Sequence, residues 1–411
     1  MNQQMRKNNN RAEFRKSLGL VLVFVGMQFN TAIKNVILGM DISIVIMLLS
    51  ALLLFDIKGI AKIRMSNKTI VLFMLQIFLL LVSLVSNQGT TQLITFHLYL
   101  LAIIYALSTN KEYIQFTYFG KILFWVSGFI AILILFQATN GFTRLNLTFD
   151  NTGKLWLSQG GDPITMSRAL EFNFIACLFY KEKNKFEKNI ITWIFVASDI
   201  IGVFSFGNRS VIVCSVVVFL IWYIRYFNRK IDVKKLLITV MVIIAIVYVG
   251  SSVTYFLDKI NAVYSSMKNG LGTLFNFGTV SLDPSAQTRV TILSDMKNEF
   301  DADFIKNFLM GMGYNYTYVD RPIYQIYFDF GFVGLIFYAY FLLLIPIKTI
   351  IGQLKNDKEY NEAWILVVYS MVQTLGDQFL TGLPYYYYLW TPTIFVLFSL
   401  TNYKYKNNGI G

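Results

Sequence analysis

Arg209 lies in the short segment 207–210 (Gly-Asn-Arg-Ser), between two apolar runs at 190–206 and 211–224. Each run approaches the length that an α-helix needs to cross a bilayer. Placing an arginine in hydrocarbon costs about 2.5–3.5 kcal/mol on insertion scales, and ionisable residues in such places usually mark a pathway or a binding site. Arg209 is therefore either a functional cation at the end of a membrane helix or an interfacial side chain whose head reaches water.

Further ionisable residues share the membrane face predicted for Arg209. Arginine suits phosphate oxygens in partly dry surroundings because its planar fork donates two parallel hydrogen bonds and keeps its charge. Four arginines with acids at one face therefore predict a lipid-linked anion as the ligand, and interfacial side chains are the alternative explanation at Arg168 and Arg289. The residues in question are Arg168, Glu171, Arg209, Arg289, Asp320, Arg321, Asp329 and Asp377.

Asp320 is a candidate general base. It precedes Arg321, Pro322 and an aromatic run at 323–334 that leads into a predicted helix. General-base assistance contributes about a hundred- to ten-thousand-fold to a rate when the carboxylate reaches the proton that it takes. A solvated loop acid, or one paired with Arg321, is the alternative interpretation of the same spacing.

The elements that position these residues are predicted from composition. The chain has 411 residues, of which 55% are hydrophobic and 14% charged, as is typical of a polytopic membrane protein. Its apolar runs are continuous and show no period-two alternation, so they predict helices and not barrel strands. The expected fold class is all-α, with about twelve transmembrane helices. Their approximate ranges are 17–33, 36–55, 69–86, 92–107, 119–137, 166–180, 190–206, 211–227, 236–253, 326–347, 362–380 and 385–400.

Lysine and arginine are unevenly distributed among the connections between these runs. Positively charged loops stay cytoplasmic, and basic clusters at 181–188 and 225–235 alternate with connections that contain few basic residues. Both termini are therefore predicted to be cytoplasmic, while the long connections 138–165 and 254–325 face outward. The whole chain, 1–411, is predicted to form a single integral membrane domain.

The outer connection at 254–325 is too long to be a simple link between helices. Asp283 and Pro284 predict a helix start, and apolar residues recur at helical spacing from Val290 to Phe300. We expect this helix to lie on the membrane surface.

Several function classes and ligands are excluded or not expected. The net charge of +13 resides in short loops at helix ends and not in a separate basic domain, which argues against nucleic-acid binding. Segment 311–313 (Gly-Met-Gly) predicts a turn, because it lacks the lysine and the strand context of a phosphate-binding loop. The predicted outer loops contain no acidic pair with metal-ligand spacing, so we expect neither an essential divalent ion nor another cofactor.

Four features together resemble the Wzy-type polysaccharide polymerases and the related O-antigen ligases, multi-helix enzymes of the bacterial envelope with a GT-C-like fold. These features are the turn at 208–210, the large outer connection, Arg289 followed by 311–313, and the stretch 320–334 that enters a helix. The resemblance covers most of the chain in architecture.

The chain departs from the ligases at one position. The ligases have a His-Asn pair before a Tyr-Leu-Gln stretch and a Glu-x-Gly ending. At the matching positions this chain has Asp320-Arg321, Tyr324-Gln325 and Asp329-Phe330-Gly331. An acid thus stands in place of the ligase histidine, which favours a polymerase.

The resemblance implies a glycosyl transfer at the outer face of the bacterial cytoplasmic membrane. A hydroxyl of one undecaprenyl-diphosphate-linked oligosaccharide repeat unit attacks the anomeric carbon of another, with inversion and release of undecaprenyl diphosphate. Arg209 and Arg289 would stabilise charge on the leaving group, and Asp320 would orient or deprotonate the acceptor hydroxyl. Membrane lipid, a chain-length regulator and a flippase are the expected partners. Diphosphate and sugar binding is expected of Arg168, Glu171, Arg321, Tyr324 and Asp377.

Two other functions fit the same general pattern. A flippase or transporter of lipid-linked oligosaccharide would place polar groups at the membrane midplane and along an inward path. Here the ionisable residues gather near the predicted outer ends, and the inner halves of the spans are nearly uncharged. An O-antigen-type ligase, which moves a finished glycan to a non-lipid acceptor, is the other alternative.

Overall fold

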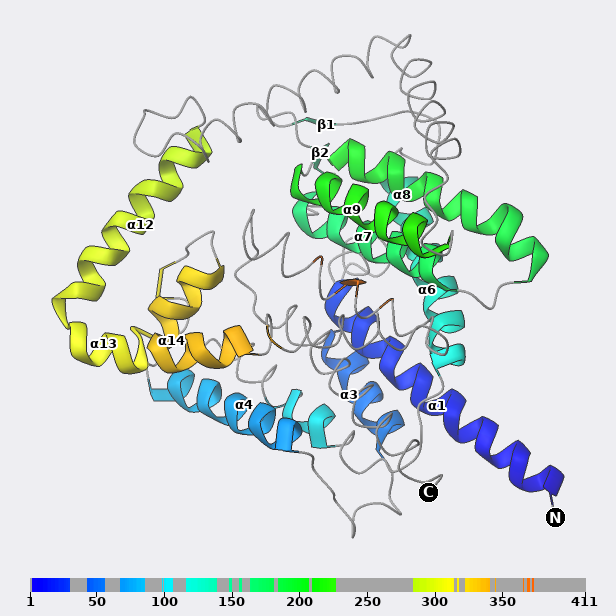
Figure 1. Ribbon diagram of the computed structural model, residues 1–411, viewed down its shortest axis with the longest axis horizontal. Coiled ribbons are helices and arrows are strands. Elements are labelled where there is room, and N and C mark those ends of the chain that lie inside the picture. Colours follow the sequence, from blue (N-terminus) through cyan, green and yellow to red (C-terminus); the bar gives the residue numbers. More distant parts are fainter. Residues whose placement is uncertain are drawn as a thin grey trace.

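The computed structural model of the chain is almost entirely helical in the residues that it describes (Figure 1). Within these residues, extended pairing is confined to two short antiparallel strands, β1 (Thr148–Phe149) and β2 (Leu155–Trp156). The all-α prediction is therefore confirmed. The structure describes residues 2–29, 43–55, 67–85, 98, 100–105, 116–138, 148–149, 155–156, 163–180, 184–206, 209–226, 284–313, 316–317, 322–340, 344, 365, 368–369 and 372.

Most described helices overlap the predicted apolar runs, while the helices at 284–302 and 304–310 lie in the predicted outer connection. The first helix starts well before the run at 17–33, and in the runs 36–55 and 326–347 the described helices cover residues 43–54 and 326–339. The predicted spans at 236–253 and 385–400 lie outside the described residues, and those at 92–107 and 362–380 are described only in part. The helices are α1 (Asn2–Gln28), α3 (Ser43–Leu54), α4 (Asn67–Val85), α6 (Phe116–Ala138), α7 (Pro163–Phe179), a π-helical turn η3 (Glu187–Ile191), α8 (Thr192–Phe206), α9 (Arg209–Tyr226), α12 (Pro284–Ala302), α13 (Phe304–Met310) and α14 (Pro322–Ala339).

Local sequence signals explain several helix starts. Proline is the first residue of α7, α12 and α14, where its fixed φ suits the helix and its missing N–H has no helical partner to lose. The start predicted at Pro284 is thus confirmed. Ahead of α8, Asn184 and Glu187 cap each other reciprocally: Asn184 N donates to Glu187 Oε2 at 3.0 Å, and Glu187 N donates to Asn184 Oδ1 at 2.8 Å.

The described helices differ in how well they match a bilayer crossing. Tyr118–Phe136 of α6 has 19 residues and a mean hydropathy of 2.2, and it alone in the described part of the chain has the length and composition that a span needs. Shorter apolar stretches occur in α3, α4, α8 and α9. The predicted total of about twelve spans therefore stays a prediction.

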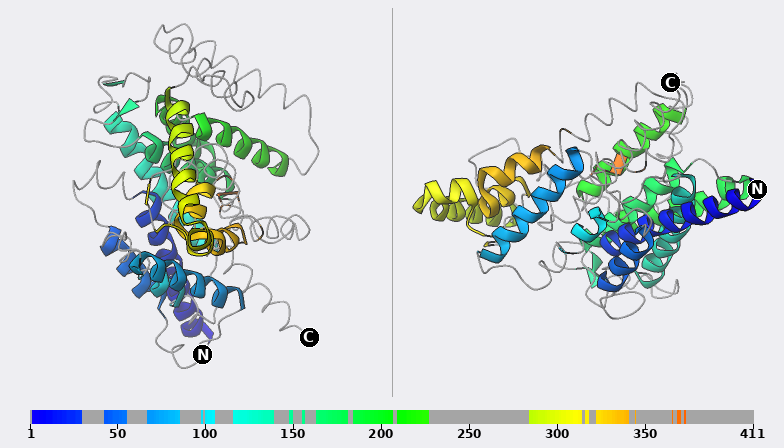
Figure 2. Two further views of the ribbon diagram at one scale, coloured as in Figure 1. Left: turned by 90° about the vertical axis from the view of Figure 1, so that its left-hand side faces the viewer. Right: turned by 90° about the horizontal axis from the view of Figure 1, so that it is seen from below.

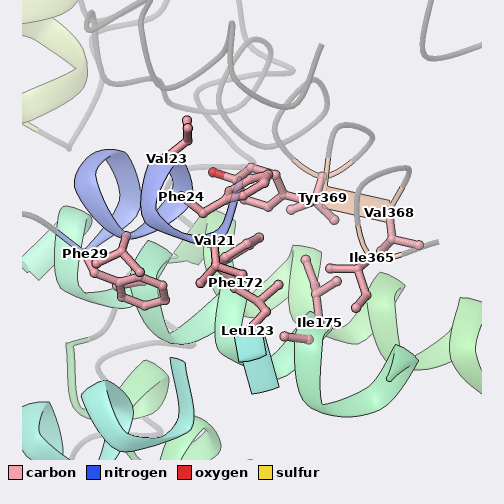
Figure 3. Packing of buried hydrophobic residues seen from close by; sticks show 14 of the residues in the cluster. Val21, Val23, Phe24, Phe29, Leu123, Phe172, Ile175, Ile365, Val368 and Tyr369 are labelled. Atoms are coloured by element: carbon pink, nitrogen blue, oxygen red, sulfur yellow. The ribbon is translucent and has the colours of Figure 1, made fainter. Parts of the chain in front are cut away.

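The main apolar core joins α1, α6 and α7 with Ile365, Val368, Tyr369 and Val372. Phe172 of α7 is central to it, because its ring stacks on Phe24 at a centroid distance of 4.9 Å and meets Tyr369 edge-on at 4.6 Å (Figure 3). Aromatic pairs of this kind contribute about 0.5–1.5 kcal/mol each beyond the area that they bury. This packing fixes α7, the helix that bears Arg168 and Glu171.

The helices α12, α13 and α14 lie at one side of the molecule, with α4 next to α14 (Figure 2). The apolar face that was predicted for the helix after Pro284, which is α12, packs against protein. Its Met296 and Phe300 form a second, smaller cluster with Phe328 of α14. The face expected on the membrane surface is therefore occupied by protein contacts at these two residues.

Candidate functional site

A buried ion pair lies near the start of α7. Arg168 Nη1 donates to Glu171 Oε2 at 2.7 Å, and both side chains are buried. Their spacing of three residues puts them on the same helix face. A buried guanidinium needs a carboxylate of this kind, because an uncompensated charge in a dry interior is strongly unfavourable.

The same arginine joins α7 to α9. Arg168 Nη2 donates to Ser210 Oγ at 3.0 Å, and Ser210 is the second residue of α9. Arg209 is the first residue of that helix, so its backbone lies beside this contact; its side chain is outside the described part of the structure. We call Arg168, Glu171 and Ser210 the α7–α9 cluster.

The surroundings of the α7–α9 cluster, and not its own charges, favour an anion next to it. Arg168 and Glu171 together are formally neutral. Arg209, which immediately precedes Ser210 in the chain, adds a positive charge. The first N–H groups of α9 also point toward this end of the helix, where the helix dipole favours negative charge. Together these groups suit a phosphate-bearing ligand.

A second set of predicted residues lies on α14, which bends at Gly331 (φ 65°). Gln325 Nε2 donates to Asp329 Oδ1 and to the Thr317 carbonyl, both at 2.9 Å. Asp329 is buried, whereas Tyr324 in the first turn is 43% exposed. The structure thus separates these two positions by environment, with the acid inside the fold and the tyrosine on its surface.

The segment 311–313 crosses α14 at this bend. Met312 N donates to the Phe328 carbonyl at 2.7 Å, and Gly313 N donates to the Asp329 carbonyl at 3.1 Å. A Cβ added to Gly311 (φ 79°) would lie 2.2 Å from the Asp329 carbonyl oxygen, so only glycine allows this approach. Two of the sequence features that carried the family resemblance therefore meet in space.

The remaining predicted site residues are not brought to the α7–α9 cluster in the described structure. Arg289 belongs to α12, which packs on α13 and α14 and lies apart from α7 in Figure 1. The side chain of Arg289 is not described. Asp320, Arg321 and Asp377 lie outside the described residues. Of the four predicted arginines, the described structure places two at the α7–α9 cluster: Arg168 by its side chain and Arg209 by its backbone.

The sequence interpretation missed a second buried polar cluster farther along α7. Asn173 Nδ2 donates to both carboxylate oxygens of Asp199, at 2.9 and 2.8 Å, and Asn173 Oδ1 accepts from Ser127 Oγ at 2.6 Å. Cys177 Sγ lies 3.5 Å from the same oxygen. We call this the α6–α8 cluster, because its side chains come from α6, α7 and α8.

A sequence signal for the α6–α8 cluster exists. Asp199 is the only acid in the apolar run 190–206, and an ionisable residue inside such a run is a functional candidate by default. The list of ionisable residues predicted at the outer membrane face omitted Asp199, which lies in the middle of its run. Its partners could not be read from the chain, because they lie on other helices.

Comparison with known proteins adds no assignment. No protein-family model matches the chain, and no curated protein matches it significantly.

Proposed function

We propose that this chain is a membrane polysaccharide polymerase, which joins undecaprenyl-diphosphate-linked oligosaccharide repeat units at the outer face of the bacterial cytoplasmic membrane. The proposal includes about twelve transmembrane helices, both termini in the cytoplasm and no metal requirement. One observation supports it most: the buried Arg168 connects Glu171 to the first turn of α9, next to Arg209. This arrangement fits a phosphate-bearing lipid at one end of a helix pair.

The distribution of charge along α7 supports the proposed orientation. The α7–α9 cluster lies near the beginning of α7, whereas the exposed Lys185 and Lys188 follow its other end. Positive loops stay cytoplasmic, so the beginning of α7 would face outward. Exposed apolar side chains on α6, such as Phe129 at 59% and Phe136 at 47%, fit contact with lipid.

In the proposed reaction, an acceptor hydroxyl oxygen forms a bond to the anomeric carbon of the donor sugar. The bond from that carbon to the diphosphate oxygen breaks, and its electron pair leaves with undecaprenyl diphosphate. Arg209 would stabilise the charge that develops on the leaving group, and Asp320 would take the hydroxyl proton. Arg289, on α12, would contribute in the same way only in a state in which its side chain reaches the same diphosphate. Arg168, already bonded to Glu171 and Ser210, would hold the start of α9 in place.

One observation favours a second candidate function, the transport of lipid-linked oligosaccharide across the membrane. Asp199 is buried in the middle of an apolar run and is bonded to Asn173. Acids inside predicted membrane segments occur in proton relays of pumps and transporters. The α6–α8 cluster thus has the position that a coupling site needs.

The deciding experiment reconstitutes the purified chain into vesicles with a synthetic polyprenyl-diphosphate repeat unit. A polymerase converts this substrate into a ladder of longer products without nucleotide or added metal. A transporter leaves the repeat unit at its original length and changes the leaflet in which its sugars react with an impermeant reagent. A Lys185→Ala variant, altered at an exposed side chain away from the α7–α9 cluster, serves as the control and should match the wild type.

A further inference from the structure

The short helix α13 presents large apolar side chains outward. Its inner side is fixed to the protein, because Asn307 is buried and its Nδ2 donates to the Phe300 carbonyl at 3.0 Å. The outer side holds four large residues that are half exposed or more: Phe304 (50%), Ile305 (77%), Leu309 (50%) and Met310 (51%). An exposed apolar face of this kind marks an interaction surface.

Polarity changes abruptly where α12 ends and α13 begins. The last turns of α12 expose three acids, Asp295, Glu299 and Asp301, and one base, Lys297, and the exposed Asp303 precedes α13. From Phe304 onward the exposed side chains are apolar, apart from Lys306. A surface that turns from acidic to apolar within two residues is expected at a boundary between water and hydrocarbon.

The apolar face of α13 is held rigidly and continues onto α14. The rings of Phe308 and Phe332 stack at 5.1 Å with an interplanar angle of 14°. Gly311 and Gly331 lock the end of α13 against the bend of α14, since a Cβ on Gly331 would meet the Leu309 carbonyl at 2.7 Å. Beyond this contact the exposed Phe332 and Ile336 extend the apolar strip along α14.

We propose that α13 is an interfacial helix whose exposed face is seated in the hydrocarbon margin of one bilayer leaflet, while α12 stands in water beside it. Lipid acyl chains are the partner. Lys306 limits how deeply α13 inserts into the leaflet. Its apolar stem can bring the ammonium to the headgroups only if the helix stays close to the membrane surface. Amphipathic helices of this kind insert about 5–10 Å into the boundary region. The inference rests on the membrane placement within the proposed function.

The experiment uses the full-length chain in phosphatidylcholine vesicles with a nitroxide spin label at single introduced cysteines. Cys177 and Cys214 are buried, so the unsubstituted chain provides the background. Ile305→Cys tests α13, Asp295→Cys is the water reference, and Phe129→Cys is the lipid reference. Collision with oxygen reports hydrocarbon, and collision with a water-soluble nickel chelate reports water. We expect several-fold more relaxation by oxygen than by nickel at 305 and 129, and the reverse at 295.

The other outcomes separate the two proposals. If the label at 305 relaxes like the label at 295, while the label at 129 reports hydrocarbon, α13 lies in water. This result overturns the inference but does not contradict the membrane placement. A label at 305 that neither reagent reaches means that protein covers α13, which also overturns it. If 129 itself reports water, the membrane placement fails. All three introduced cysteines replace exposed residues, so folding is not at risk.

Discussion

Two buried polar clusters on α7 are built in opposite ways. The α7–α9 cluster pairs a cation with an anion and adds a hydroxyl, and it links α7 to α9. In the α6–α8 cluster the Asp199 carboxylate accepts from the neutral Asn173 amide, whose oxygen in turn accepts from Ser127, so that α7 is linked to α6 and α8. Arg168 and Asn173 are about 7.5 Å apart along the helix axis. Side chains one and a half turns apart thus create two different electrostatic environments.

The difference indicates different roles. An arginine that is already compensated by a carboxylate stays charged when buried, so it can help to organise an anion site without an unpaired interior charge. A carboxylate that accepts from an amide suits a proton site or a structural link between helices. The predictions below test whether this division holds.

The largest effect is expected from breaking the ion pair. Glu171→Leu should lower the free energy of unfolding by about 3–5 kcal/mol, because the Arg168 guanidinium loses its buried partner. The double variant Arg168→Met with Glu171→Leu should lose less than the single variant, since it removes both charges. Unfolding by SDS titration in detergent micelles measures both. A double variant that is less stable than Glu171→Leu would contradict the buried pair.

Arg209→Ala should reduce polymer formation by about a hundred- to a thousand-fold, which is the usual effect of removing one donor to a developing charge. The protein should still insert and unfold normally. Arg209→Lys should rescue poorly, because a point charge cannot reproduce the bidentate fork. The polymer ladder from vesicles measures both variants, and a ladder of normal length from Arg209→Ala would reject the assigned role.

Ser210→Ala should have a smaller effect on stability, about 1.5–3 kcal/mol, because it removes one hydrogen bond to a charged group and leaves the ion pair in place. Ser210→Thr keeps the hydroxyl and should stay close to the wild type. The same SDS titration compares them. Equal losses in the two variants would show that the contact with Arg168 does not depend on the hydroxyl.

The smallest effect is expected from Asp199→Asn if the chain is a polymerase. The new amide oxygen can still accept from Asn173, so the free energy of unfolding should fall by less than about 1.5 kcal/mol and the polymer ladder should remain. If the chain is a transporter with a coupling acid, this variant should abolish transport instead. Measuring ladder length and sugar accessibility on the same vesicles distinguishes the two outcomes.

Parts of the α7–α9 cluster follow from the sequence. The apolar run at 166–180 predicts the helix, and the spacing of Arg168 and Glu171 then puts both on one face. The bond to Ser210 does not follow, because the two residues are 42 positions apart and meet only when α7 packs on α9. The proposed role of Arg209 also depends on the packing of α7 on α9, because Arg209 is next to Ser210.

The α6–α8 cluster shows more clearly which contacts cannot be predicted from the sequence alone. Asp199 could be noticed as a lone acid in an apolar run, but Asn173 is 26 positions away and Ser127 lies 46 positions before Asn173. Each partner looks unremarkable in its own helix. The list of ionisable residues predicted at the outer membrane face therefore overlooked a site that exists only through helix packing.

The sequence by itself determined the all-α class, the approximate positions of the described apolar helices and the helix start at Pro284, because these depend on composition and on residues within a few positions of each other. The tertiary structure decided which polar groups meet: Arg168 with Ser210, Asn173 with Asp199, and Gly311 with the bend at Gly331. Such contacts join distant parts of the chain, and they depend on how whole helices pack.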